Sequence, residues 1–269
     1  MRKHLSNFLG FNRHSAALLS AFLLTCFLIV YIWWPLAVEY WGYVRIYHEA
    51  GYPWYRLVDW LLLGIFAFMS LTIVARADLR VDGLIILVGL AGGLVIESWG
   101  TQTNLWHYYT AERPPLWIIP AWPIASLSID RITRALNRAT AHWSESIFRA
   151  AYWPLLAAFY ALMLVFVAPT FDKTYTWAAL ALSALLLLTP PSQRRTLLVF
   201  AAGSALGYFL ERWGTTRECW TYYTGETPPV FAVFAHGMAA VAFWRSGLLV
   251  EQVWKLVTRQ PGPCSLPQR

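Results

Sequence analysis

Runs of apolar residues about as long as a lipid bilayer is thick recur along the whole chain. The first, SAALLSAFLLTCFLIVYIWW from Ser15 to Trp34, contains no charged residue. A helix needs about 20 mostly apolar residues to cross the hydrocarbon layer. The composition, 58% hydrophobic and 13% charged, leaves too little polar surface for a soluble globule of 269 residues. We therefore expect an all-α integral membrane protein with about eight transmembrane helices, at residues 15–34, 57–76, 82–100, 115–130, 150–168, 175–190, 196–213 and 229–248.

Basic residues occupy alternate junctions between these segments. Arg2, Lys3 and Arg13 precede the first segment, and the other basic junctions hold Arg76 and Arg80, then Arg131 to Arg149, Arg194 and Arg195, and Arg245 to Arg259. Because Lys and Arg are retained on the cytoplasmic side, the pattern predicts a multi-pass protein of the cytoplasmic (inner) membrane with both termini in the cytoplasm. The net charge of +7 then reflects this topology and the anionic inner leaflet, so the bilayer is an expected partner and nucleic acid is not.

The chain repeats itself at an offset of 114 residues. Between the stretch Glu97 to Pro115 and the stretch Glu211 to Pro229, 11 of 19 positions are identical. An offset that contains an even number of spans keeps both copies in the same orientation, which predicts two parallel four-helix repeats. The expected organisation is a cytoplasmic N-terminus at 1–14, a first repeat at 15–137, a second repeat at 138–256 and a disordered cytoplasmic tail at 257–269.

Each repeat contains an acidic residue that follows two glycines at four-residue spacing. The sets are Gly89, Gly93 and Glu97, and Gly203, Gly207 and Glu211. Residues four apart share a helix face, and small residues there let a second helix approach closely. Each Glu is therefore expected at a seam between helices and not against lipid.

An aromatic loop and a Pro-Pro pair follow each Glu. Trp and Tyr also form anchoring belts at membrane interfaces, which is the simpler explanation for any single ring. A belt does not require the same rings at the same offset from a carboxylate, so the repetition favours a site. The candidate substrate-binding residues are Trp99, Trp106, Tyr108, Tyr109, Trp122, Trp213, Trp220, Tyr222 and Tyr223.

A carboxyl group surrounded by indoles and phenols has two chemical uses. Out of water it can donate a proton to a carbon–carbon double bond, with the ring faces stabilising the resulting carbocation. Ionised, it can instead attract a cationic headgroup. The candidate catalytic residues are Glu97, Glu211 and His236, the last being the only histidine deep in an apolar segment. That imidazole could relay a proton, or simply be hydrogen-bonded to a neighbouring helix.

The order Glu-x-x-Gly, a short gap, a Tyr-rich aromatic run, Pro and another span resembles that of the membrane-embedded carotenoid hydratases. It is more loosely similar to the small helical lycopene cyclases. The resemblance covers the two motif-bearing segments and implies a cofactor-independent reaction, in which a carboxyl from Glu97 or Glu211 protonates a terminal double bond of a carotenoid or other isoprenoid polyene. Water or an internal alkene then traps the cation.

Two other classes of function stay open. In the first, the Trp and Tyr residues of the two loops bind or transport a lipid headgroup, with Glu97 and Glu211 as counter-ions. In the second, the chain is a structural subunit that meets protein partners in a larger pigment-bearing membrane complex. No sequence motif points to nucleotide, zinc or flavin chemistry, and the three cysteines, Cys26, Cys219 and Cys264, lie in separate regions. We therefore expect neither a metal nor an organic cofactor.

Overall fold

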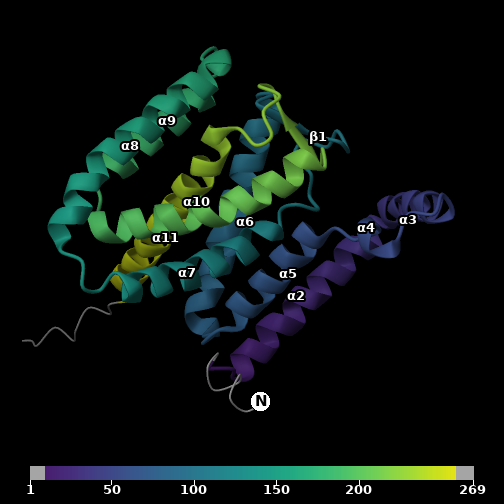
Figure 1. Cartoon of the computed structure of the whole chain (residues 1–269). Coiled ribbons are helices and arrows are strands. Elements are labelled where there is room, and N and C mark those ends of the chain that lie inside the picture. Colours follow the sequence, from purple (N-terminus) through teal and green to yellow (C-terminus); the bar gives the residue numbers. More distant parts are fainter. Residues whose placement is uncertain (1–9, 259–269) are drawn as a thin grey trace, which may run out of the picture.

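The computed structural model describes residues 10–258, and helices make up most of that range (Figure 1). Each of the eight predicted segments overlaps a helix, although the bounds differ. The elements in chain order are α2 Arg13–Ile32, α3 Trp34–Glu49, α4 Trp54–Leu57, α5 Trp60–Val74, α6 Leu79–Gln102, β1 Trp106–Tyr108, α7 Ala121–Ala139, α8 Glu145–Val167, the 3-10 turn η1 Ala168–Thr170, α9 Thr174–Leu188, α10 Gln193–Thr216, β2 Trp220–Tyr222 and α11 Val230–Thr258. The tail predicted at 257–269 lies outside the described residues beyond Thr258, the last residue of α11.

Within residues 10–258, four helices are long and apolar enough to cross a membrane by length and composition. These are α2, α6, the stretch Glu145–Thr170 that contains α8, and α11. Two further apolar helices, α5 and α9, have 15 residues each. The segment predicted at 115–130 starts late, because the chain stays in turns up to Pro120 and α7 begins at Ala121. The chain therefore has the character of a helical membrane protein.

Two helix hairpins, α6 with α7 and α10 with α11, form the centre of the molecule. They also pack on each other, α7 against α10 and α6 against α11. The glycines, which have the same spacing in both halves, let the two helices of each hairpin pack closely. A Cβ on Gly93 would lie 2.4 Å from the ring of Trp122, and one on Gly207 would lie 2.5 Å from His236. These glycines thus let the return helix bring a ring close to the glutamate helix, as the spacing predicts.

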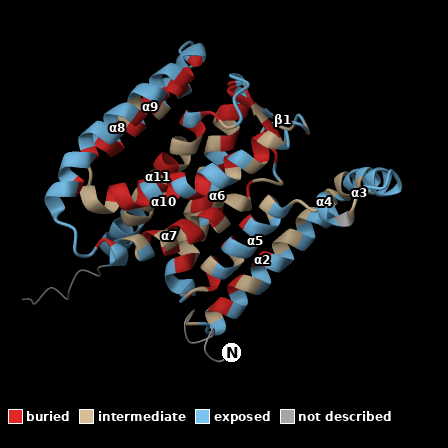
Figure 2. Cartoon of the chain, in the orientation of Figure 1, coloured by how far each residue is buried: buried red, intermediate tan, exposed pale blue. Residues whose placement is uncertain are grey.

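Peripheral helices cover the two hairpins on opposite sides. The pair α2 and α5 packs against α7, and the pair α8 and α9 packs against α10 and α11. Figure 1 shows these pairs at the two flanks of the molecule, with α3 projecting beyond the end of α2. Figure 2 shows the buried residues gathered on the central helices, whereas α3 has none.

Several elements recur at the offset of the sequence match. Adding 114 to the bounds of α5, α6 and β1 gives the bounds of α9, α10 and β2. The correspondence does not extend to the preceding connections. The helices α3 and α4 lie between α2 and α5, whereas the shorter η1 joins α8 to α9.

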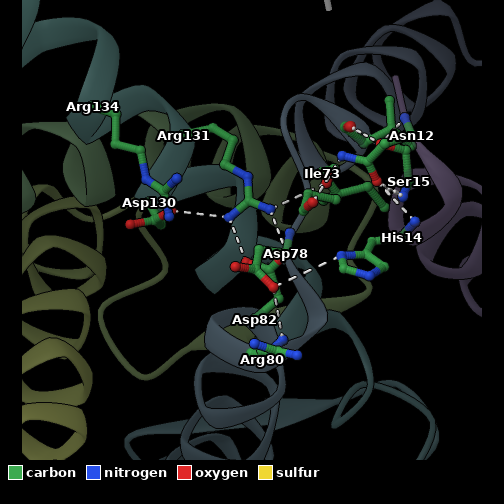
Figure 3. Close-up of polar contacts among 12 residues, drawn as sticks. Asn12, His14, Ser15, Ile73, Asp78, Arg80, Asp82, Asp130, Arg131 and Arg134 are labelled. Atoms are coloured by element: carbon green, nitrogen blue, oxygen red, sulfur yellow. Dashed lines mark hydrogen bonds and ion pairs between the residues drawn. The ribbon is translucent and has the colours of Figure 1, made fainter. Parts of the chain in front are cut away.

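The end of the core away from the strands is held by a buried ion pair (Figure 3). Arg131 meets Asp82 in two hydrogen bonds of 2.8 and 2.7 Å, and the same guanidinium lies 2.9 Å from Asp130. Asp130 also pairs with Arg134 at 2.6 Å. Asp130 therefore pairs both with its chain neighbour Arg131 and with Arg134. In the other half Thr196 stands at the offset of Asp82, and Arg245 donates to the backbone oxygens of Leu186 and Thr189 instead.

Candidate functional site

The two aromatic loops form a short antiparallel ribbon at the ends of α6 and α10. Trp106 pairs with Tyr222, His107 with Thr221 and Tyr108 with Trp220. Side chains alternate along a strand, so Trp106 and Tyr108 turn inward together while His107 is exposed. The sequence predicted loops here and did not predict that the two copies would pair.

A glycine one turn after each Glu lets the first ring of each strand fold back onto its helix. A Cβ on Gly100 would lie 1.8 Å from the indole of Trp106, and one on Gly214 would lie 2.0 Å from that of Trp220. No other residue leaves that space. This close approach brings each indole N–H back to the glutamate that precedes it in the helix.

Glu97 accepts three hydrogen bonds from side chains. Its Oε2 accepts from Trp106 Nε1 at 3.1 Å and from the Tyr108 hydroxyl at 2.9 Å, and its Oε1 accepts from Trp122 Nε1 at 3.1 Å. The residue is 4% exposed. An indole N–H can only donate, so the pocket requires an acceptor on both carboxylate oxygens.

Glu211 has the same arrangement with one substitution. Trp220 Nε1 donates to its Oε2 at 2.9 Å, and the Tyr222 hydroxyl donates to its Oε1 at 2.9 Å. His236, at the offset of Trp122, places Nε2 2.8 Å from Oε1. Because imidazole can gain or lose a proton, this half contains an acid–base pair where the first half contains only a donor.

Both phenols stay protonated. Burial first, and the neighbouring carboxylate second, raise the pKa of Tyr108 and of Tyr222 well above the usual value. Each hydroxyl is therefore fixed as a hydrogen-bond donor to its glutamate across the physiological range.

Aromatic contacts join the two half-sites. The Trp122 ring stacks on the His236 ring with centroids 5.5 Å apart. Trp106 contacts Tyr222, and Tyr108 contacts Trp220, each at 5.8 Å. The two carboxylates therefore belong to one continuous cluster of aromatic rings.

A single cavity of about 640 Å³ adjoins both glutamates, and its walls are almost wholly apolar. Such a volume, with few polar groups among aromatic rings, is typical of a small-molecule site. Of the predicted site residues, the lining contains Glu97, Trp99, Trp106, Tyr108, Trp122, Glu211, Trp213, Trp220, Tyr222 and His236.

Two predicted residues lie outside the cavity. Tyr109 is 55% exposed and Tyr223 is 45% exposed, and neither lines it. Each follows an inward-facing tyrosine, so the strand alternation turns it away. The Tyr223 hydroxyl instead donates to the backbone oxygen of Phe166 at 2.8 Å. The structure therefore does not bring Tyr109 and Tyr223 to the cavity with the other predicted site residues.

Two residues that were not predicted, Trp117 in the cavity wall and Asp59 behind it, also shape the site. Trp117 lines the cavity and meets Tyr108 edge-to-face at 5.5 Å. Asp59, ahead of α5, accepts a hydrogen bond from Trp213 Nε1 at 2.9 Å. Phe231 stands at the offset of Trp117 and Lys173 at that of Asp59, so the repeat gave no signal for either. Trp213 itself was predicted, but not its partner.

No protein-family model, curated protein or solved structure matches this chain. The chemistry therefore has to be argued from the site itself. Among residues 10–258, no group of three or more His, Cys, Asp or Glu is arranged to hold a metal ion.

The arrangement can supply and receive a proton inside an apolar space. One carboxylate shares a short hydrogen bond with an imidazole, and the other is fixed by three donors. The rings between them present electron-rich faces, which attract a developing positive charge. Both features suit chemistry that begins by protonating an unsaturated hydrocarbon, and a carboxylate among ring faces also suits the binding of a cation.

Proposed function

We propose that this chain is a membrane enzyme that performs acid-initiated hydration or cyclisation of a carotenoid or other isoprenoid polyene. One observation carries the proposal: two buried acidic side chains, one of them hydrogen-bonded to a histidine, adjoin a single apolar cavity lined by aromatic rings. A polyene has no polar group to bind, so a cavity of this kind suits it. The reaction needs no organic cofactor.

The two halves take different roles in this proposal. The pair of His236 and Glu211 supplies the proton, because only this half contains a second titrating group. Glu97 is held as an acceptor by three donors and stabilises the positive charge through space. Trp122, stacked on His236 and bonded to Glu97, lies between them.

The proposed reaction begins with a proton transfer to the polyene and ends with the return of a proton to the protein. A proton passes from the pair of His236 and Glu211 to the less substituted carbon of a terminal double bond, leaving a tertiary carbocation. In hydration, water forms a C–O bond to the tertiary cationic carbon and returns one proton to the pair of His236 and Glu211. In cyclisation, an internal alkene forms the new C–C bond to the cationic carbon, and the resulting cation loses a proton to the pair of His236 and Glu211, which restores a double bond. Both routes regenerate the starting protonation state.

The membrane arrangement that accompanies this function is part of the proposal. We infer that the chain inserts as two parallel four-helix repeats in the cytoplasmic membrane, with both termini in the cytoplasm. The common offset of α5, α6 and β1 with α9, α10 and β2 supports the repeats. The alternation of Arg and Lys supports the orientation, with the ribbon on the outer side. The helices α5 and α9, with 15 residues each, are the short members of the proposed eight.

The experiment is turnover of an acyclic carotenoid by purified variants. Glu211→Gln and His236→Gln should reduce turnover by about two orders of magnitude or more, as expected for loss of a general acid. The exposed residues Glu226 and His107 provide matched controls, since Glu226→Gln and His107→Gln make the same chemical changes outside the cavity. Full activity in Glu211→Gln and His236→Gln would refute the proposal.

The same variants separate the two alternative functions. A headgroup-binding protein would show no turnover, but would lose co-purified choline lipid in Glu97→Gln and Glu211→Gln. A structural subunit would retain its lipid and lose a partner protein on mild detergent extraction. Either result would replace the enzymatic proposal.

A further inference from the structure

The cavity extends well beyond the two glutamates. One part of its wall comes from α2 and α5, including Cys26 and Phe66, and another comes from α9, including Tyr175, Ala178 and Leu182. The space therefore reaches from the twin carboxylates toward both flanks of the molecule.

On the first flank, polar contacts hold α5 against α10 at the end near the ribbon. Asp59 accepts a hydrogen bond from Trp213 at 2.9 Å and forms an ion pair with Arg217 at 3.0 Å. The helices α5 and α10 also pack directly on each other. This seam joins a helix of the first half to a helix of the second.

The equivalent seam, between α9 and α6, lacks these polar contacts. Subtracting or adding 114 puts Lys173 in place of Asp59, Trp99 in place of Trp213 and Thr103 in place of Arg217. Lys173 pairs with its neighbour Asp172 at 2.6 Å, and Trp99 Nε1 has no acceptor among residues 10–258. Over the same range, α9 makes no packing with α6 comparable to that of α5 with α10.

The residues of this open seam are apolar and accessible while also lining the cavity. Val95 of α6 is 68% exposed and Leu182 of α9 is 55% exposed, and both line it. Ala178 and Tyr175, on the same side of α9, are exposed lining residues too. A wall that is at once inside the cavity and at the surface is an opening.

We propose that the seam between α6 and α9 is a lateral portal, through which a long linear hydrocarbon chain enters the cavity from the lipid. Both helices are apolar, and α6 is long enough to cross the membrane, so the opening faces hydrocarbon. A chain that moves sideways from lipid into an apolar cavity never exposes its surface to water. The portal rests on the proposed function only for the identity of the hydrocarbon that enters, since any linear hydrocarbon would use it.

Uptake of a non-reacting probe tests the portal. The probe is the methyl ester of parinaric acid, a linear conjugated tetraene, delivered from phosphatidylcholine vesicles to the full-length protein in bilayers. Energy transfer from the tryptophans of the cavity reports its arrival. The rate of the fast phase of energy transfer, which wild type shows, is compared across variants. Energy transfer to probe that remains in the lipid is then a background common to all of them.

Two matched pairs of variants on α9 give the decision. Leu182→Ala widens the portal, whereas Leu185→Ala makes the same change at a residue that is equally exposed, 57% against 55%, but does not line the cavity. Ala178→Trp obstructs the portal, and Ala181→Trp adds the same bulk at an exposed position outside the lining. We expect Ala178→Trp to slow uptake about tenfold and Leu182→Ala to speed it severalfold, as changes that act on access alone.

Equal uptake rates within each pair would overturn the portal. If Ala178→Trp fails to fold, the leucine pair decides alone, because both positions are at the surface. A portal that operates while Glu211→Gln and His236→Gln keep full carotenoid turnover would leave this inference standing and remove the proposed function. Turnover that depends on those residues, with no difference within the pairs, would do the reverse.

Discussion

Replacing each glutamate by glutamine should cost very different amounts of stability, although the two sites share the same plan. The amide of Gln has one acceptor atom and one donor group. In Glu97→Gln, the amide oxygen can keep the bonds from Trp106 and Tyr108, which both reach Oε2. The amide NH2 must then face Trp122 Nε1, which can only donate. Two donors meet in a buried space.

In Glu211→Gln, the conflict can be avoided. The amide oxygen keeps the bond from Trp220, and the NH2 faces the Tyr222 hydroxyl and His236 Nε2. A hydroxyl oxygen and a neutral imidazole nitrogen can both accept. A hydrogen bond survives at each of the three contacts, but the charge assistance is lost and the Tyr222 hydroxyl changes from donor to acceptor.

The structure sets the size of the difference. Glu211→Gln weakens bonds without breaking one, a loss of about 1 to 2 kcal/mol. Glu97→Gln adds the loss of one bond and an unsatisfied buried donor, for a total of about 4 kcal/mol. Trp122→His would give Glu97 the partner that Glu211 already has. In that background, Glu97→Gln should destabilise the protein by about 2 kcal/mol less than it does in wild type.

Thermal unfolding of the detergent-solubilised protein, followed by tryptophan fluorescence, measures this difference. A gap of about 2 to 3 kcal/mol corresponds to roughly 5 to 10 °C in the midpoint for a chain of this size. Equal midpoints for the two Gln variants, or no relief of Glu97→Gln by Trp122→His, would show that the hydrogen-bond polarity described above is incorrect.

Three further predictions follow from the packing and the loops. Gly93→Ala should destabilise the α6–α7 hairpin by about 1 to 3 kcal/mol in unfolding experiments, because its Cβ would overlap Trp122, whereas Gly83→Ala, with open space around it, should not. Asp82→Ala should cost about 2 to 3 kcal/mol, because the buried Arg131 loses two charge-assisted hydrogen bonds and keeps Asp130 as its remaining carboxylate partner, and a smaller loss for the double variant Asp82→Ala/Arg131→Met would confirm the pairing. Burial raises the pKa of Cys219 to about 11 from 9.0, so its thiolate form appears only at high pH. Iodoacetamide should then label it about a hundredfold more slowly at pH 8 than an ordinary exposed thiol, and equal labelling rates would contradict its burial.

Much of the candidate site could be predicted because the repeat marks it. Residues such as Glu97 and Glu211 keep a fixed offset from their glycines and rings, and helical spacing alone places Gly93 beside the return helix. The sequence also singles out His236 against Trp122 as the main difference between the halves. Local periodicity and self-comparison are sufficient for such features.

The remaining features depend on contacts between segments that are far apart in the chain. The ribbon of β1 with β2 joins residues 112 to 116 positions apart, and three-residue strands carry too little pattern to predict pairing. The bond from Trp213 to Asp59 has no counterpart in the other half, so self-comparison could not reveal it. Nor could the sequence show that only one of the two equivalent seams is closed.

Deuterium incorporation tests the central claim most directly. Purified protein in bilayers is incubated with an acyclic carotenoid in heavy water, and the recovered pigment is analysed by mass spectrometry. Acid initiation predicts a product that carries one non-exchangeable deuterium on carbon, whether water or an alkene traps the cation, and none of this product with Glu211→Gln. Pigment recovered unchanged and free of carbon-bound deuterium would contradict the account.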